Sequence, residues 1–225
     1  MKNTHDGFAI ALAWPETLCK QAGAWYDNLM HLVGVNSKGY YKVGHAAIVL
    51  VDGKSGKCHY LDFGRYHAPH GHGRVRSAIT DHDLKISTGA RFSHEIGSIE
   101  NLLDILNELQ NNPSTHGAGT IYASAIRINS SNALQFALEL NKRDYIPYGP
   151  FIKNGTNCSR FVNSVLQIGV SDIKSNILLK LPWMLTPTPM WNLQAINGNI
   201  LSMCQATELI CSENVKLEIA HEQIA

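Results

Sequence analysis

The sequence lacks an excess of charge of either sign. Among its 225 residues, 19 lysines and arginines stand against 18 aspartates and glutamates, which leaves a formal net charge of +1. The basic residues are scattered, and no cluster combines aromatic with basic side chains. Proteins that bind nucleic acid through charge usually show such a cluster. The composition therefore argues against a nucleic-acid partner.

Long hydrophobic runs are missing too. No apolar run approaches the roughly 20 residues that a helix needs to cross a bilayer. The run at 8–14 is short, follows Asp6 and leads into Pro15-Glu16 instead of a small-residue cleavage site. We interpret it as a first strand and not as a signal peptide. No integral membrane segment is expected, and a cytoplasmic location is predicted.

Closely spaced cysteine pairs are also absent. The number of cysteines is odd and no CxxC pair occurs; the five are Cys19, Cys58, Cys158, Cys204 and Cys211. Disulfide frameworks and structural zinc sites both depend on such pairing, so we expect a reducing compartment, no metal and no cofactor. Pairing of Cys204 with Cys211 is a less favoured alternative. No repeat divides the chain, and residues 1–225 are predicted to form a single domain.

One cysteine does stand where chemistry is expected. Gly155 frees the backbone to turn, and Thr156 or Asn157 can cap a helix. Apolar residues then recur every three to four positions over 161–166, which predicts a buried helical stripe. Cys158 therefore falls at or just before the first helical turn, where amide donors and the helix dipole favour a thiolate. The alternative is a small buried cysteine that only packs.

A histidine occurs far from this cysteine along the chain, in a predicted hairpin. The apolar run 43–51 and the run 58–64 are separated by turn residues and predict paired strands. His45 is the ionisable group of the first strand. Cross-strand neighbours lie about 5 Å apart, so the hairpin brings Asp62 or Tyr60 near His45. Asp62 is the preferred partner because a carboxylate would stabilise the imidazolium. Structural roles for His45 and Asp62 remain open.

Residues 65–83 are rich in histidine, glycine and arginine and are predicted to be a loop. The loop is either a polar wall beside a pocket or a transition-metal site, and the histidines lack the i, i+4 spacing typical of helical ligands. The candidate ligands are His67, His70, His72 and His82. Helices are expected at 98–109 and after Ser130, a short strand at 83–86, a strand at 120–128, and a C-terminal extension at 170–225.

These features supply the parts of a Cys-His-polar triad, in which a thiolate attacks, an imidazole moves the proton and a third group orients the ring. Two motifs carry a resemblance: Gly-His-Ala-Ala-Ile at 44–48 and Asn-Cys-Ser-Arg-Phe-Val at 157–162. With the histidine strand before the cysteine helix, the chain resembles the circularly permuted papain-like hydrolases. That group includes the lecithin:retinol acyltransferase-like enzymes and permuted relatives of NlpC-type cell-wall peptidases.

The resemblance implies an α+β fold, with a small antiparallel sheet packed against helices and a papain-like core in permuted order. It implies that Tyr148, upstream of Cys158, borders the acyl site and is a candidate oxyanion donor. A turn tyrosine that packs on neighbouring prolines is the alternative. Tyr60 is a second candidate for an oxyanion or substrate contact.

The sequence thus predicts a thiol hydrolase, a peptidase or amidase, with Cys158, His45 and Asp62 as its triad. Its substrate would be a peptide or acyl-amide, cleaved through a covalent thioester. Two alternatives stay open: a non-catalytic binding module on the same fold, and a metal-binding protein that uses the histidine-rich loop. No membrane helix follows the cysteine, which argues against a retinoid-type acyltransferase.

Overall fold

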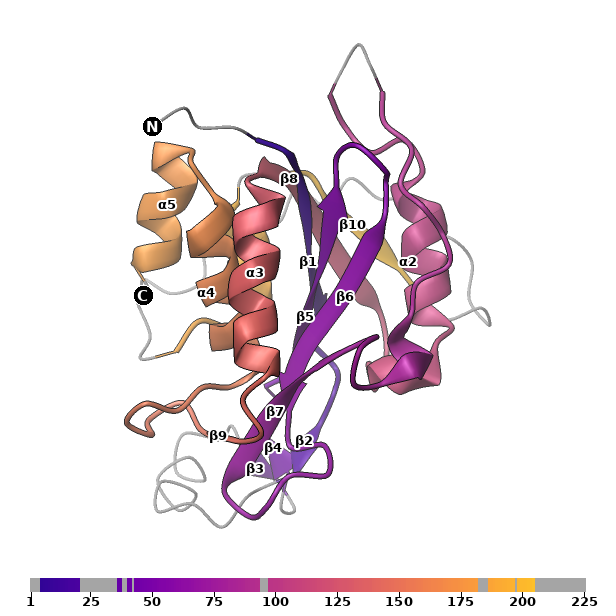
Figure 1. Cartoon of the computed structure of the whole chain (residues 1–225). Coiled ribbons are helices and arrows are strands. Elements are labelled where there is room, and N and C mark those ends of the chain that lie inside the picture. Colours follow the sequence, from indigo (N-terminus) through magenta and orange to yellow (C-terminus); the bar gives the residue numbers. More distant parts are fainter. Residues whose placement is uncertain are drawn as a thin grey trace, which may run out of the picture.

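A seven-stranded antiparallel sheet forms the centre of the molecule (Figure 1). The computed structural model describes residues 5–20, 36–37, 40–41, 43–93, 97–181, 186–196 and 198–204. The strand order is β10-β8-β1-β5-β6-β7-β9. The strands are β1 (Gly7–Trp14), β5 (His45–Asp52), β6 (Cys58–Gly64), β7 (His72–Ser77), β8 (Ile121–Ile128), β9 (Ile146–Pro147) and β10 (Ile200–Met203). A separate small sheet contains β2 (Cys19–Lys20), β3 (Asn36–Ser37) and β4 (Tyr40–Tyr41).

The first strand lies between β5 and β8 and is buried on both faces. Its side chains alternate in size, because successive residues of a strand point to opposite faces. The alanines Ala9, Ala11 and Ala13 join one core, and Ile10, Leu12 and Trp14 join the other. The strand predicted at 8–14 is therefore confirmed, and its continuous apolar character follows from having a core on each side.

Helices cover both faces of the sheet (Figure 1). On the alanine face lie α3 (Ser130–Asn141), α4 (Cys158–Gly169), α5 (Ile173–Lys180) and α6 (Pro189–Ala195). On the other face lies α2 (Leu102–Gln110). The expected α+β class, with an antiparallel sheet packed against helices and the histidine strand before the cysteine helix, is confirmed. Among the described residues, no helix is long and apolar enough to span a membrane.

The β5–β6 hairpin has the register that the site requires. Asp52 closes its turn by accepting hydrogen bonds from the amides of Lys54 at 3.0 Å and Ser55 at 2.6 Å. The turn places Ala47 opposite Asp62. Because side chains two residues apart share a face, Asp62 is the diagonal neighbour of His45. The strands expected over 43–51 and 58–64 are confirmed within one or two residues.

Several segments differ from the sequence-based expectations. The expected loop 65–83 contains β7 and a 3-10 helix, His82–Leu84, which also replaces the short strand expected at 83–86. Strand β7 was missed because its arginines, which look solvent-exposed in the sequence, are held in ion pairs within the fold. The extension from 170 onward contributes α5, α6 and the edge strand β10. Cys211 lies outside the described residues.

Candidate active site

Cys158 is the first residue of α4, and the residue before it caps the helix. The Asn157 side chain accepts a hydrogen bond from the Arg160 amide at 2.8 Å and donates one to Thr186 Oγ1 at 3.1 Å. The first amides of a helix have no partner within it, and they carry the positive end of the helix dipole. The cap thus fixes the Cys158 sulfur, which is buried, beside donors that favour a thiolate.

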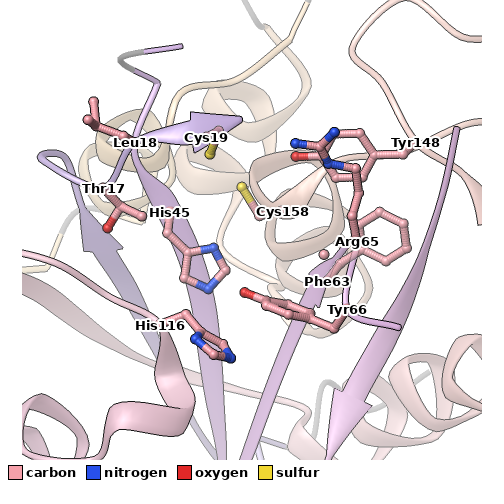
Figure 2. Close-up of a pocket in the computed structure, with 11 residues that line it drawn as sticks. Thr17, Leu18, Cys19, His45, Phe63, Arg65, Tyr66, His116, Tyr148 and Cys158 are labelled. Atoms are coloured by element: carbon pink, nitrogen blue, oxygen red, sulfur yellow. The ribbon is translucent and has the colours of Figure 1, made fainter. Parts of the chain in front are cut away.

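His45 is the first residue of β5 and is buried. Gly44 turns the chain just before it with φ +72°, and a Cβ there would lie 2.9 Å from the Trp14 carbonyl oxygen, so glycine is required. The Trp14 ring stacks on the imidazole with a centroid distance of 5.8 Å. His45 Nε2 lies 3.3 Å from Asp62 Oδ2, which leaves Nδ1 as the ring nitrogen that can interact with the Cys158 sulfur (Figure 2).

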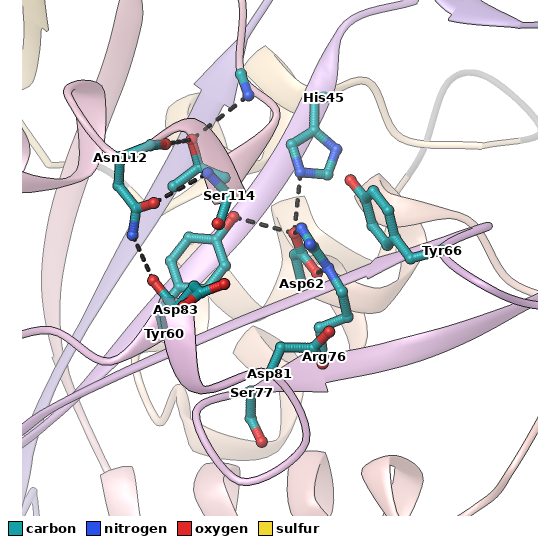
Figure 3. A network of polar contacts seen from close by, with 12 residues as sticks. His45, Tyr60, Asp62, Tyr66, Arg76, Ser77, Asp81, Asp83, Asn112 and Ser114 are labelled. Carbon is teal, nitrogen blue, oxygen red and sulfur yellow. Dashed lines mark hydrogen bonds and ion pairs between the residues drawn. The ribbon is translucent and has the colours of Figure 1, made fainter.

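Asp62 is fully buried at the centre of a polar network (Figure 3). Arg76 donates from Nε to Oδ1 at 2.9 Å and from Nη2 to Oδ2 at 2.5 Å. The Tyr60 hydroxyl donates to Oδ2 at 3.0 Å. Burial acts to raise the pKa of Asp62, but hydrogen bonds and charge from His45 and Arg76 outweigh it and hold that pKa below its usual value. Asp62 is therefore an anion that orients His45.

The balance between burial and nearby positive charge also gives Cys158 a different pKa from Cys19 and Cys58. Burial acts to raise the pKa of Cys158, but the hydrogen bond and positive charge of His45 lower it overall. Burial acts to lower the pKa of His45, and its contacts with Asp62 and Cys158 raise it overall. Burial instead raises the pKa of Cys19 to about 12 and that of Cys58 to about 11. The arrangement favours a thiolate–imidazolium pair at Cys158 and His45.

A pocket of about 300 Å³ opens onto this pair (Figure 2). Aromatic, cationic and small polar side chains line it: Thr17, Leu18, Cys19, His45, Phe63, Gly64, Arg65, Tyr66, His116, Tyr148 and Cys158. No carboxylate of the described residues belongs to that lining. Because Cys158 lines the pocket, a substrate carbonyl that enters it can contact the sulfur.

The two tyrosines singled out in the sequence lie in different places. Tyr148 lines the pocket, where its ring stacks on Phe63 at 5.9 Å between centroids and lies 5.2 Å below the Arg65 guanidinium. Tyr60 is not part of the lining, and its hydroxyl is used in the bond to Asp62. Tyr60 thus lies behind Asp62, where its hydroxyl supports the carboxylate.

Sequence reasoning missed four residues that the fold brings to the site: Cys19, Tyr66, Arg76 and His116. They come from separate segments, and no spacing rule joins them to Cys158. The one available signal was the alternation Arg74-Val75-Arg76, which is typical of a strand with one buried and one polar face. Its position within a glycine- and histidine-rich stretch hid that signal.

The histidines considered as metal ligands do not converge. His72 Nδ1 lies 3.1 Å from the carbonyl oxygen of His70, and His67 occupies the left-handed region with φ 50°. Across the part of the chain that the structure describes, no group of three or more His, Cys, Asp or Glu side chains could hold a metal ion. Instead, Arg65 and Tyr66 at the start of the histidine-rich segment line one wall of the pocket. Residues further along the segment form strand β7.

Comparisons with known proteins place the chain in a family. The chain resembles the crystal structure of the type VI secretion system effector TseH, with a TM-score of 0.56 over 90% of this chain and 95% of that chain. Sequence identity is 20%, so this likeness shows a shared fold. No curated protein matches. The family model described as type VI secretion system effector TseH-like matches residues 9–175, which is most of the chain. The chain therefore belongs to the TseH-like family of type VI secretion system effectors.

Proposed function

We propose that this protein is a thiol hydrolase, a peptidase or amidase, whose nucleophile is Cys158. One observation carries the proposal: the sulfur at the start of α4 meets the imidazole at the start of β5, and the far nitrogen of that ring faces a buried carboxylate. Nucleophile, base and orienter within hydrogen-bonding reach are what covalent acyl transfer requires. The substrate is a peptide or an acyl-amide.

The reaction follows from the charges. The Cys158 thiolate attacks the carbonyl carbon, an S–C bond forms, and the π electron pair moves onto oxygen. The His45 imidazolium gives its proton to the amine as the C–N bond breaks, which leaves a thioester. Neutral His45 then takes a proton from water as the water oxygen attacks the thioester carbon. The S–C bond breaks with its electron pair on sulfur, the carboxylic acid leaves, and the thiolate and imidazolium are restored. Asp62 holds the ring throughout, and the Cys158 amide and Tyr148 are candidate donors to the oxyanion.

The order of the parts supports a papain-like core in permuted form, since the histidine strand precedes the cysteine helix. The family description adds a setting: the proposed hydrolase would serve as a type VI secretion system effector. The cytoplasmic location expected from the sequence stays a prediction. The restriction of the reaction to amide or peptide bonds is part of the proposal too.

Thiol labelling tests the activated nucleophile directly. With iodoacetamide at pH 6 and peptide mass spectrometry, Cys158 is expected to react before Cys19 and Cys58, because only its pKa is lowered among these three. Thiolates and not thiols are the reacting species. Equal labelling of the three would contradict an activated nucleophile.

An acylating probe separates an enzyme from a binding module. p-Nitrophenyl acetate should give a burst of nitrophenolate and an acetyl group on Cys158, and the Cys158→Ala variant should give neither. A binding module on the same fold would form no acetyl-enzyme. Turnover of the acetyl-enzyme would then show hydrolysis.

A further inference from the structure

Tyr66 is a pocket residue whose ring is held from two sides. The Arg76 guanidinium carbon lies 3.5 Å from the centre of the Tyr66 ring, and the His116 ring stacks on it at 5.0 Å between centroids. A Cβ at Gly64 would lie 2.2 Å from Tyr66 Cε2, so the ring occupies space that only glycine leaves open. Arg76 is itself fixed by its two bonds to Asp62. The position of the Tyr66 ring is thus tied to the triad.

The hydroxyl of this ring is directed at the reacting groups. Figures 2 and 3 both show it pointing toward His45, and in Figure 2 it lies in the pocket that Cys158 also lines. Among the described residues, no hydrogen bond involves the Tyr66 hydroxyl. The hydroxyl of Tyr60, in contrast, donates to Asp62. Burial and the negative charges of Asp62 and Cys158 raise the pKa of Tyr66 well above 10, so it stays a donor.

We propose that Tyr66 is a further catalytic residue, whose hydroxyl donates a hydrogen bond to the oxyanion that forms when Cys158 attacks a carbonyl. This inference rests on the proposed function. As the S–C bond forms, the π electron pair moves to the carbonyl oxygen, and Tyr66 stabilises that charge while it keeps its proton. When the oxyanion collapses, the C=O bond returns and the bond to the leaving group breaks. A donor held in place before the reaction stabilises such charge at little reorganisation cost.

Two reagents on the Tyr66→Phe variant of the full chain isolate this role. p-Nitrophenyl acetate acylates Cys158 through an oxyanion, and its leaving group needs no proton. Iodoacetamide alkylates the same sulfur at a saturated carbon, where no oxyanion forms. Loss of one oxyanion donor typically costs about 10²–10³-fold in rate, so the burst should slow by about 10²-fold. The alkylation rate should not change, because phenylalanine keeps the stacked ring.

Two further variants define the outcomes. Tyr145→Phe, at an exposed position away from the pocket, is the matched control and should behave as the unmodified chain does. Tyr148→Phe, measured with the same two reagents, tests whether the other pocket tyrosine also stabilises the oxyanion. Equal bursts for Tyr66→Phe and the unmodified chain would overturn the proposal, and so would equal slowing of acylation and alkylation, which would mark a purely structural role. If the unmodified chain and Cys158→Ala give the same burst, the proposed function fails, and this inference fails with it.

Discussion

At the scale of single residues, the site is a set of buried charges that compensate one another. Asp62 accepts from three side chains, and each of those donors also makes another contact. His45 faces the thiol, Arg76 supports the Tyr66 ring, and Tyr60 lies in the core. Buried charges are costly unless they are paired and hydrogen-bonded. The charge on Cys158 therefore depends on His45, and the orientation of His45 depends on Asp62.

Removal of the imidazole should greatly reduce the reactivity of Cys158 toward iodoacetamide at low pH. In a His45→Gln variant no positive charge opposes the burial that acts to raise the pKa of Cys158, so that pKa should rise. A thiolate predominates only above its pKa, and a rise of about one in that pKa lowers the thiolate fraction at pH 6 about tenfold. Alkylation at pH 6 should fall by at least that factor and recover only above about 8.5, the usual cysteine pKa, because burial then raises the pKa unopposed by a positive charge. The measurement is the iodoacetamide rate against pH.

His59→Gln provides the matched control for this experiment. His59 is half-buried on β6 but does not line the pocket. Its substitution should leave the midpoint of the pH profile where it is. A His45→Gln profile that overlaid the unmodified one would show that the imidazole does not set the charge of the sulfur.

The proposed nucleophile, base and orienter could be predicted from the sequence because each has a local signal. Cys158 follows a helix cap, His45 interrupts an apolar strand, and the hairpin register brings Asp62 to its diagonal. Tyr66 and His116 have no such signal, since they are 50 residues apart and meet only when their rings stack in the folded chain. The local sequence pattern thus predicts Cys158, His45 and Asp62, whereas tertiary packing determines which residues line the pocket around them.

At the scale of elements, the start of α4 links stability to reactivity. Asn157 satisfies the Arg160 amide, and its own amide group reaches Thr186, which lies shortly before α6. An N-cap of this kind typically contributes about 1 kcal/mol. The same cap fixes the turn from which the Cys158 sulfur projects, so two measurable properties depend on one side chain.

Asn157→Ala should lower both stability and reactivity. Loss of the cap should cost about 1 kcal/mol, which corresponds to a fall of about 2–4 °C in Tm for a chain of this size. The iodoacetamide rate of Cys158 at pH 6 should fall as well. Asn129→Ala is the matched control, because Asn129 caps α3 by accepting from the Asn132 amide at 2.9 Å, outside the pocket lining. It should show the loss in Tm alone. Equal Cys158 rates in the two variants would separate the cap from the chemistry.

Element prediction worked where the apolar residues form a continuous run or a regular stripe and failed where they do not. Helix α4 buries a regular stripe, so its bounds followed from spacing and from Gly169. Helix α5 exposes Ile173 to 76% and Ile177 to 51%, and its apolar residues therefore show no single face. Strand β10 is only partly buried at the sheet edge, so its sequence lacks the apolar run typical of the inner strands.

At the scale of the whole molecule, the groups of the site also join neighbouring strands. His45 on β5 contacts Asp62 on β6, and Asp62 is paired with Arg76 on β7. The network thus spans three strands of the central sheet at the point where the pocket opens. A change at its centre should alter the stability of the whole fold and the response of that stability to pH.

Asp62→Asn should therefore destabilise the protein in a pH-dependent way. Removal of one partner from a buried ion pair typically costs about 3–5 kcal/mol, since the other charge stays buried. The pKa of Asp62 is lowered in the folded state, so its contribution is present above the usual value of 3.8 and is lost as pH falls through the lowered pKa. The free-energy difference between the two proteins should thus be large near pH 6 and shrink below pH 3.8. Thermal or urea unfolding at several pH values measures it.

Asp81→Asn is the matched comparison, because Asp81 forms a two-bond ion pair with Arg74 but remains a fifth exposed. Ion pairs in contact with water contribute less than buried ones, so its loss near pH 6 should be clearly smaller than that of Asp62→Asn. The remaining carboxylates are common to both variants and the unmodified chain, so their own titration largely cancels in the differences. Equal losses for the two variants would show that the Asp62 network does not hold the strands together. A difference for Asp62→Asn that grew as pH fell from 6 toward 3.8 would show instead that its carboxyl is protonated in the folded protein, and the orienting role of Asp62 would fall with it.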